Sequence, residues 1–292
     1  RRTPEPAELG DVEHVHVDRA ELASVADRLQ DVDAVVDTFA FTAGNTTPVL
    51  DALPDGPRLL VLSSMDVYQA YGSLHAGTVS ELVPDDETGP VRSERYPYRG
   101  QIPGMDNYEK LDVEELYLER DATVCRLPMV YGEHDGQRRE WFILRRVHAG
   151  RKRIPIGAGT WLSTRGYVAD MATGVRLALE STDAAGEIFN LGERRSPTVA
   201  LWAQMILDAA GSDAELVRVP DTALPEDLEL TTAIAQHLVC DSSKARRMLG
   251  WDETDPTDAL RRSVAWHLAN PPDDDGAFDA DDDALAQALS RP

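Results

Sequence analysis

The alternation of short apolar runs with helical runs limits most strongly what this chain can fold into. Residues 12–18 (VEHVHVD) alternate as a strand does, while residues 33–40 (DAVVDTFA) and 58–64 (RLLVLSS) are dense in β-branched and aliphatic side chains. Further strands are expected within residues 122–132 and 186–192. Apolar strands that alternate with helices imply right-handed crossovers and a parallel sheet covered on both faces. The sequence therefore predicts an α/β fold with a doubly wound parallel sheet.

The pattern of expected strands and helices changes near residue 133, which predicts a second and smaller domain. Residues 1–132 carry the strand–helix alternation, and residues 133–270 read mainly as helices and loops. The helix and the strand within residues 170–192 are expected to return to the first domain. The tail, residues 271–292, holds seven Asp and one Arg, so we expect it to be solvated and mobile, with a weak helix at its end.

Composition and charge exclude several classes of function. The chain has 29 basic and 52 acidic residues, and a net charge of −23 repels phosphate backbones and anionic membranes. No apolar run approaches the roughly 18 residues that a membrane span needs, and no charged-then-apolar signal opens the chain. Cys125 and Cys240 provide neither a disulfide framework nor a metal cluster. We therefore expect a cytoplasmic protein that binds a small molecule, without metal, membrane or nucleic acid as partners.

Four stretches of the sequence resemble the extended short-chain dehydrogenase/reductases, the NAD-dependent epimerase/dehydratase family. They are LVLSSMDVY at 60–68, the helical stretch with Lys110 and Glu114, CRLPMVYG at 125–132, and GYVADMATGVRLALE at 166–180 followed by GEIFNLGE at 186–193. Their order and spacing together carry the resemblance. It implies a Rossmann-like domain that uses NADP or NAD for hydride transfer with a small polar substrate, sugar-like or nucleotide-linked.

The resemblance implies two catalytic roles. Ser64 lies four residues before Tyr68 and matches the Ser or Thr whose hydroxyl hydrogen-bonds the reacting oxygen of the substrate. Lys110, one of only three lysines, matches the lysine that holds the ribose hydroxyls of the nicotinamide half. The plainer alternatives are that Ser64 caps the turn after its strand and that Lys110 is a solvated helix residue.

The resemblance also implies a set of cofactor contacts. Asp18 matches an Asp that meets the edge of the adenine ring, and Arg19 lies beside it. Phe39 and Ala40 end the next strand and would pass behind the cofactor, while Pro128 matches the segment against the nicotinamide. Ligands of such sheets bind outside the carboxyl ends of the strands, so these positions agree with one another. Each position is equally compatible with ordinary loop structure.

The start of the chain departs from the family pattern. A complete domain opens with a strand and a G-x-x-G-x-x-G loop whose amides hold the pyrophosphate, and no such pattern precedes Val12. The resemblance places Arg1 and Arg2 just after the second strand, where arginines often bind the 2′-phosphate of NADP. NADP is therefore slightly preferred over NAD. Either the chain starts inside the domain, or the protein lacks the phosphate cradle.

The residues before Lys110 depart from the family pattern as well. The family keeps a tyrosine four residues before its lysine, but here that position is Asp106, and the nearest tyrosine is Tyr108. On a regular helix, residues 106 and 110 lie about 40° apart, and residues 106 and 108 about 200° apart. We therefore expect Lys110 to point into the cleft beside Ser64. Asp106 would be ionised and paired with it, and Tyr108 would be turned away. The alternative is a helix that starts near Asn107, which lets Tyr108 swing inward.

Other polar side chains near the expected cleft could supply the acid or contact the substrate. Asp66, Tyr68 and Tyr131 are the nearest candidate acids in the sequence. Met129 stands where relatives that act on nucleotide-linked sugars often have Asn, and a thioether cannot make the contacts of an amide. Tyr131 and Arg165 remain as substrate-side groups. Arg165 would hold a phosphate or a carboxylate, or else form a surface salt bridge.

Two functions remain open at this point. The first is an NAD(P)-dependent epimerase, dehydratase or reductase with a rearranged acid–base set. The second is a catalytically inactive relative used for nucleotide sensing or macromolecular binding; a basic face within residues 138–153 favours it, and the net charge argues against nucleic acid. We expect a homodimer through the helix at 106–119 and the helix after Ala43, because relatives commonly pair these into a four-helix bundle.

Overall fold

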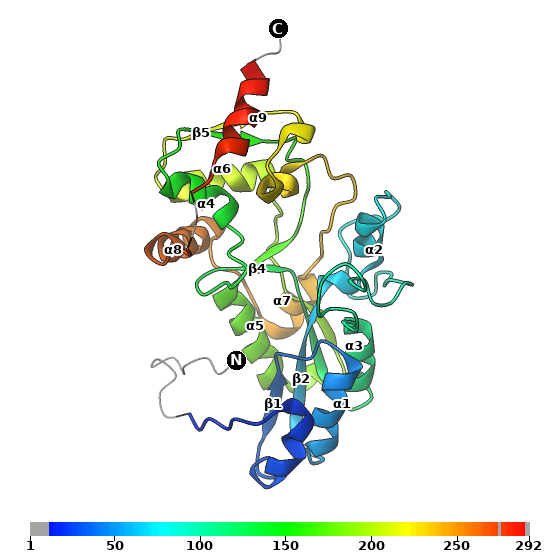
Figure 1. Ribbon diagram of the computed structural model, residues 1–292. Coiled ribbons are helices and arrows are strands. Elements are labelled where there is room, and N and C mark those ends of the chain that lie inside the picture. The colour runs from blue at the N-terminus through cyan, green and yellow to red at the C-terminus, as the bar shows by residue number, and fades with distance from the viewer. Residues whose placement is uncertain (1–11, 274–275, 290–292) are drawn as a thin grey trace.

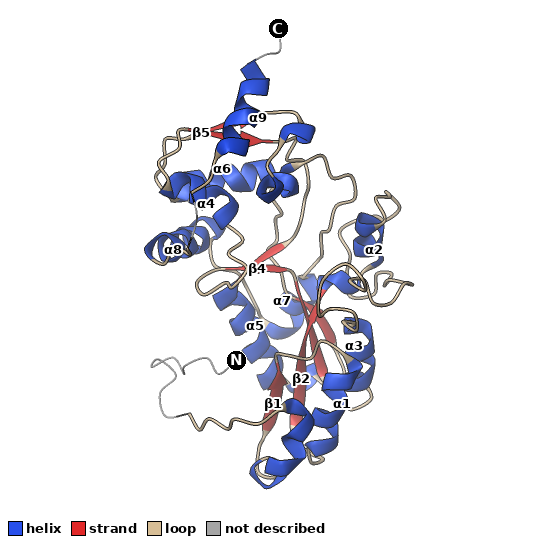
Figure 2. Cartoon of the chain, in the orientation of Figure 1, coloured by secondary structure: helices blue, strands red, loops and turns tan. Residues whose placement is uncertain are grey.

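Four parallel strands form a sheet in the order β1–β2–β3–β7, which confirms the α/β fold predicted from the alternation of apolar runs. The computed structural model describes residues 12–273 and 276–289 of the chain (Figure 1, Figure 2). The strands are β1 (Ala34–Asp37), β2 (Arg58–Ser64), β3 (Thr123–Leu127), β4 (Met129–Tyr131), β5 (Arg153–Ile156), β6 (Arg165–Tyr167), β7 (Ile188–Asn190) and β8 (Glu215–Arg218). The α-helices are α1 (Ala43–Ala52), α2 (Gln69–His75), α3 (Lys110–Leu118), α4 (Trp141–His148), α5 (Val168–Glu180), α6 (Val199–Ala209), α7 (Ser243–Leu249), α8 (Pro256–Ala269) and α9 (Asp279–Leu289). Within the described residues, none of these helices has the length and hydropathy to cross a membrane.

Helices cover both faces of the four-stranded sheet. On β2, Leu59 and Val61 point to one side, where they pack with Val113 of α3 and with α1. Leu60 points to the other side, where it packs with Met171 of α5 and with α7. Figure 1 shows α1 and α3 on one side of β2, and α5 and α7 on the other. Burial on both faces explains why β2 is an almost continuous apolar run rather than an alternating one.

A second lobe holds α4, α6 and α8 with the β5–β8 pair, around a core that includes Trp202, Ile206 and Leu260. It lies at the top of the view in Figure 1, with the sheet at the bottom. The segment 170–192 forms most of α5 and all of β7 in the sheet lobe, and α7 packs there as well. The chain therefore crosses between the lobes more than once, and both lobes contribute side chains to the space between them.

The stretch from Val12 to Asp18 is not a strand, so this part of the prediction is wrong. These residues have no regular structure, and Val12 and Val15 are 57% and 44% exposed. Within the described residues, β1 pairs with β2 alone and so forms an edge of the sheet. A strand is stable only where a neighbouring strand takes up its backbone hydrogen bonds and its apolar face is covered. An alternating sequence supplies neither condition by itself.

The acidic tail, predicted to be solvated and mobile, is packed where it forms α9. Asp281 is 2% exposed and accepts hydrogen bonds from Nε and Nη2 of Arg146, each at 2.7 Å. Arg146 is fully buried and also contacts Asp227 at 2.7 Å. Ala284 and Leu285, one turn further along α9, are buried too. A buried guanidinium is costly without partners, and two carboxylates offset that cost for Arg146, so the pairing with Asp281 orders this helix.

We predict that Asp281→Ala loosens α9 and destabilises the second lobe. The free energy of unfolding should fall by about 2 kcal/mol, less than the roughly 3–5 kcal/mol for a buried ion that loses its sole partner, because Asp227 remains. Asp283→Ala, at an exposed position of the same helix, should change it by less than about 0.5 kcal/mol. Urea unfolding and limited proteolysis of the segment after Asn270 measure both variants. Equal effects of the two substitutions would contradict this account of the tail.

Candidate active site

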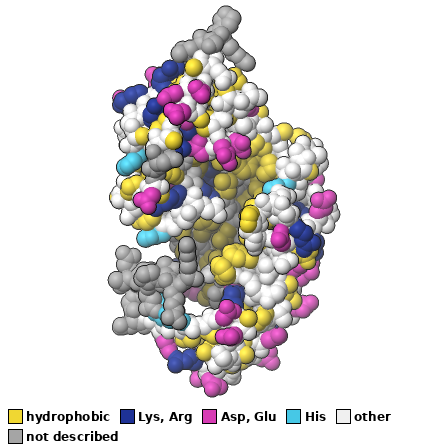
Figure 3. Space-filling view, viewed as in Figure 1, with side chains coloured by type: hydrophobic (Ala, Val, Ile, Leu, Met, Phe, Trp, Pro, Cys, Tyr) yellow, Lys and Arg dark blue, Asp and Glu magenta, His cyan; other side chains and the backbone are white. Residues whose placement is uncertain are grey.

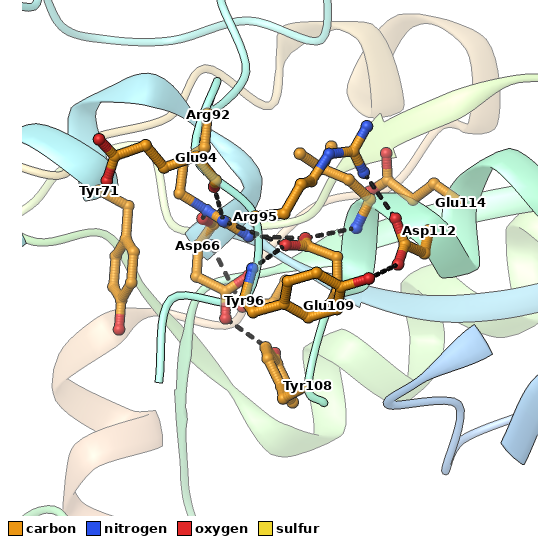
Figure 4. A network of polar contacts seen from close by, with 12 residues as sticks. Asp66, Tyr71, Arg92, Glu94, Arg95, Tyr96, Tyr108, Glu109, Asp112 and Glu114 are labelled. Atoms are coloured by element: carbon orange, nitrogen blue, oxygen red, sulfur yellow. Dashed lines mark hydrogen bonds and ion pairs between the residues drawn. The ribbon is translucent and has the colours of Figure 1, made fainter. Parts of the chain in front are cut away.

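Helix α3 begins directly after Glu109, because the buried carboxylate of this residue caps it. The Glu109 side chain accepts a hydrogen bond from the amide of Leu111 at 3.0 Å. It also accepts from the Arg92 guanidinium at 2.9 Å and from the Tyr96 amide at 2.6 Å (Figure 4). The Arg92 and Glu109 side chains are 2% and 0% exposed. Residues 106–108 therefore precede the helix, and the helical angles used to predict their directions do not apply to them.

Tyr108 points into the cleft, so the prediction that it turns away is wrong. Its hydroxyl donates a hydrogen bond to Oδ2 of Asp66 at 2.7 Å (Figure 4), and both residues line the cleft together with Ser64. Burial raises the pKa of Tyr108 above its usual range, the charge of Asp66 adds to the rise, and a hydrogen bond with Ser64 opposes it. Ser64 also caps the turn after β2 by accepting from the Asp66 amide at 3.2 Å. The alternative with Tyr108 swung inward is therefore the one that agrees with the structure.

Asp106 lies away from Lys110, which contradicts the predicted ion pair. Its side chain is exposed and accepts a hydrogen bond from the amide of Gly100 at 2.9 Å. Its main-chain carbonyl accepts from Nε of Arg99 at 3.1 Å. Asp106 therefore fixes the loop before α3 and does not line the cleft.

Lys110 connects β2 and the loop after β1 to the start of α3. Its ammonium donates to the carbonyl oxygen of Ala40 at 2.6 Å and to that of Leu62 at 2.8 Å. The same nitrogen lies 4.7 Å from the centroid of the Phe41 ring, and the residue is 4% exposed. Burial lowers the pKa of Lys110 to about 8. The two carbonyl oxygens use two of the three donors of the ammonium. Lys110 is not among the residues that line the cleft, so it does not face the cleft as predicted.

Asp66 is the buried acid of the cleft. It is 5% exposed, and its Oδ2 accepts from Tyr98 at 3.2 Å as well as from Tyr108. Its Oδ1 meets no hydrogen-bond donor among the described residues. Burial raises the pKa of Asp66, and the hydrogen bond from Tyr108 opposes the rise. A carboxyl group with a raised pKa on the wall of a cleft is a candidate general acid or base.

The cleft has a volume of about 590 Å³ and is lined by both lobes. Its walls are mostly aromatic and apolar, and Figure 3 shows hydrophobic side chains gathered in a hollow between the lobes. Besides the residues already described, the lining consists of Phe41, Met65, Tyr71, Leu74, His75, Ile102, Met105, Leu127, Pro128, Met129, Gln137, Arg139, Trp161, Thr164 and Leu238. The volume falls within the roughly 300–1,000 Å³ that is usual for small-molecule sites.

Asp18 and Arg19, predicted to contact the cofactor, hold the protein's own backbone instead. Asp18 caps the 3₁₀ helix Arg19–Arg28 by accepting from the Ala20 amide at 2.9 Å. The Arg19 guanidinium pairs with both carboxylate oxygens of Asp37, at 2.8 and 2.6 Å. This pairing, together with a hydrogen bond from Tyr117, fixes the end of β1.

Only some of the other residues predicted to contact the cofactor lie at the cleft. Pro128 lines the cleft. Phe39, two residues after the end of β1, is 58% exposed, whereas Ala40 is fully buried. Arg1 and Arg2 lie outside the described residues. Only Pro128, of this set, shares the cleft with Ser64 and Tyr108.

The residues predicted to contact the substrate are also divided. Met129 lines the cleft, but Tyr131 does not; it is 2% exposed and donates to Glu193 at 2.8 Å. Arg165 is 1% exposed, so it forms no surface salt bridge, and its guanidinium lies 4.2 Å from the centroid of the Trp202 ring. Tyr131 and Arg165 therefore belong to the interior of the second lobe rather than to the cleft.

Sequence reasoning missed the aromatic side of the cleft. The hydroxyls of Tyr98 and Tyr71 lie 2.6 Å apart, and the ring centroid of His75 lies 4.6 Å from that of Tyr71. None of these three residues was predicted as a site residue. The available signal was three tyrosines in the short span 96–108, which is more than a solvated loop needs. Asp66 was identified only as one of several acids near the strand end.

Comparison with known proteins gives the family. A model of the NAD dependent epimerase/dehydratase family matches residues 11–192, so the chain belongs to this family. The chloroplast stem-loop binding protein of 41 kDa b from Arabidopsis thaliana is 26% identical over 249 residues, which cover 82% of this chain. The chain spans 60% of the length of that protein.

Solved structures share the fold. RMD from Pseudomonas aeruginosa, solved with NADPH, aligns with a TM-score of 0.64 at 18% identity, over 87% of each chain. The dTDP-glucose 4,6-dehydratase from Bacillus anthracis, solved with NAD, aligns with a TM-score of 0.65 at 15% identity, over 90% of this chain and 82% of that one. The UDP-glucose 4-epimerase from Thermotoga maritima, solved with UDP-glucose, aligns with a TM-score of 0.63 at 19% identity, over 87% and 83%.

The described residues do not fit a dinucleotide in the way that the resemblance implies. The Lys110 ammonium is occupied by two carbonyl oxygens and a ring, and the Arg19 guanidinium by a carboxylate. Asp18 is committed to a helix cap. A dinucleotide would need contacts other than these, so we assign no reaction step to a bound cofactor.

We predict that Lys110→Met destabilises the sheet lobe. Two buried carbonyl oxygens would lose their donor, which should lower the free energy of unfolding by about 1–3 kcal/mol. Lys152→Met, at an exposed pair with Asp213, should change it by no more than about 0.5 kcal/mol.

The pH dependence of this difference tests the burial of Lys110. Because the folded pKa, about 8, lies below the unfolded value of about 10.4, the unfolded state binds more protons between these limits. The stability of the wild type should therefore rise relative to Lys110→Met as the pH rises from about 8 to about 10. Urea unfolding at several pH values measures it, and a flat difference would show that Lys110 is solvated.

Proposed function

We propose that this family member is an acid–base enzyme whose proton path runs from Asp66 through Tyr108 to an oxygen of the substrate, with Ser64 orienting that oxygen. The hydrogen bond of 2.7 Å between the phenol of Tyr108 and the buried carboxyl of Asp66, on the wall of the cleft, carries this proposal. The reaction class is that of the family: epimerisation, dehydration or reduction at a carbon that bears an oxygen.

The directions of the pKa shifts favour a relay over a single acid. The raised pKa of Tyr108 disfavours a phenolate, so Tyr108 alone would be a poor proton donor at neutral pH. The raised pKa of Asp66 allows that carboxyl group to carry the proton. With Asp66 protonated, its carboxyl group would donate to the Tyr108 oxygen, which reverses the hydrogen bond that Tyr108 donates to the carboxylate. When the substrate oxygen then takes the proton of Tyr108, Tyr108 takes the proton of Asp66, and the negative charge ends on the carboxylate. Tyr98, which also donates to Asp66, stabilises that charge.

The walls of the cleft support a substrate with a ring. The rings of Tyr71, Tyr98 and Trp161 line the cleft, and flat rings pack well against the faces of sugar rings and of planar molecules. Gln137 and Thr164 supply polar contacts. The proposed substrate is therefore a small ring compound that carries oxygen atoms. Its ring would have an apolar face, which packs on the aromatic side chains of the cleft.

NAD or NADP is the proposed cofactor, on the basis of the family and of the solved neighbours with NADPH and NAD. A preference for NADP has no contact in its favour among the described residues. Arg19 is paired with Asp37, and Arg1 and Arg2 lie outside the described range.

We predict that Tyr108→Phe and Asp66→Asn each lower turnover by about 10²-fold or more, because each interrupts the relay. Tyr96→Phe is the matched control, since its hydroxyl contacts Asp112 outside the cleft. Turnover would be followed by nicotinamide absorbance and mass spectrometry, with NADH or NADPH and a panel of nucleotide-linked sugars and ring aldehydes. Thermal unfolding separates lost chemistry from lost folding. Full activity of Tyr108→Phe would exclude the relay.

A non-catalytic role in binding nucleic acid is the second candidate, and it is favoured by the relative named for stem-loop binding. Most of the proposed basic face, however, is neutralised by ion pairs with acidic side chains. Arg139, Arg145, Arg151 and Lys152 pair with Asp135, Asp227, Asp282 and Asp213, respectively. Phosphate binding depends on free cations and a favourable field. Fluorescence anisotropy with an RNA hairpin at physiological salt should therefore show no binding, and tight, salt-dependent binding would favour this second function.

A homodimer through α1 and α3 remains a proposal. Val113 and Tyr117 of α3 are buried in the chain's own core, whereas Leu116 and Leu118 are only half-buried and are available to a second copy. Light scattering at high protein concentration should give the mass of a dimer; the mass of a monomer would count against the pairing.

A further inference from the structure

A second cavity, of about 360 Å³, lies in the second lobe and shares no lining residue with the cleft. Leu201, Trp202 and Met205 of α6 and Pro256 and Leu260 near the start of α8 form most of its wall. Leu201 is 54% exposed and so lies at the surface, whereas Trp202 is 2% exposed. The cavity is large enough for a small molecule, and its wall is mainly apolar.

One carboxyl group stands in this apolar wall. Glu193 is 7% exposed, and its Oε1 accepts a hydrogen bond from Tyr131 at 2.8 Å. Among the described residues, Tyr131 is the one side chain that donates to Glu193, and Oε2 is not one of the buried atoms sealed from solvent without a partner, so a ligand in the cavity can reach it. Burial raises the pKa of Glu193 to about 7. A buried carboxylate with one neutral partner is costly unless a cation or a further donor satisfies it.

The surrounding charges do not supply that partner. Tyr131, Arg165, Glu253 and Asp170 act on Glu193, and of these only Arg165 is a cation. Its guanidinium lies over the Trp202 ring, and neither its Nε nor its Nη2 has an acceptor in the described part of the chain. Arg165 therefore lowers the cost of the carboxylate from a distance without a hydrogen bond to it. Arg195 also lines the cavity, but it is exposed to solvent.

We propose that this cavity is a second binding site, independent of the cleft, for a small apolar amine whose ammonium pairs with Oε2 of Glu193. The apolar body of the ligand would pack on Leu201, Met205 and Leu260. The ammonium would give the buried carboxylate the charged hydrogen-bond donor that the protein leaves out. A neutral ligand of the same shape would leave that carboxylate unpaired.

Calorimetric titration with benzylamine tests the proposal, with benzyl alcohol as the neutral analogue. We expect saturable binding of benzylamine and at least about tenfold weaker binding of benzyl alcohol, since a charge-assisted pair would be lost. Affinity for the amine should rise about tenfold from pH 6 to pH 8, because Glu193 must ionise to bind it. Absence of saturable binding, or equal affinity for the two compounds, would overturn the proposal.

Variants locate the site. Glu193→Gln should weaken benzylamine binding about tenfold or more and remove its pH dependence. Glu133→Gln is the matched control, because Glu133 also accepts from a tyrosine, Tyr167, at 2.9 Å but lies outside the cavity. Leu201→Lys changes an exposed position, where a like charge should also weaken binding without unfolding the lobe. Unchanged binding in both Glu193→Gln and Leu201→Lys would place the amine elsewhere.

Discussion

The buried carboxylate of Glu109 is the interaction on which the site depends. It accepts hydrogen bonds from Arg92, from the Tyr96 amide and from the first turn of α3, and it is fully buried. These contacts fix where α3 begins. As a result, Lys110 is placed beneath the strand ends, and Tyr108 is left on irregular backbone that reaches the cleft. Buried ion pairs contribute little net stability on average, but this one determines which side chains face the cleft.

The strands of the sheet could be predicted from the sequence, because a strand buried on both faces is apolar at nearly every position. The run 58–64 became β2 at its predicted bounds. The site could not be predicted in the same way, since the start of α3 is set by Arg92, which lies 17 residues away from Glu109. The exposed run 12–18 shows the opposite error: its local pattern was that of a strand, but no neighbouring strand pairs with it within the described residues.

The lysine of the family pattern is present in this chain, and its ammonium binds main-chain oxygens. In the pattern that the sequence resembles, this lysine serves the cofactor; here, the Lys110 ammonium serves the backbone carbonyls of Ala40 and Leu62. Its presence in the sequence was therefore correct evidence for the fold, whereas its side chain does not line the cleft. Functional sites are carried by geometry rather than by fold, and the geometry of this cleft centres on Asp66 and Tyr108 instead.

The paired hydrogen bonds between Arg146 and Asp281 have a consequence for folding while the chain is being synthesised. Asp281 follows Arg146 by 135 residues, so at ordinary rates of translation the arginine leaves the ribosome roughly ten seconds before its partner. During that interval Asp227 is the carboxylate partner of Arg146 within the described residues, and the side of the guanidinium that Asp281 later covers stays hydrated. The second lobe therefore completes its packing late, when α9 is made and covers β5 and β8.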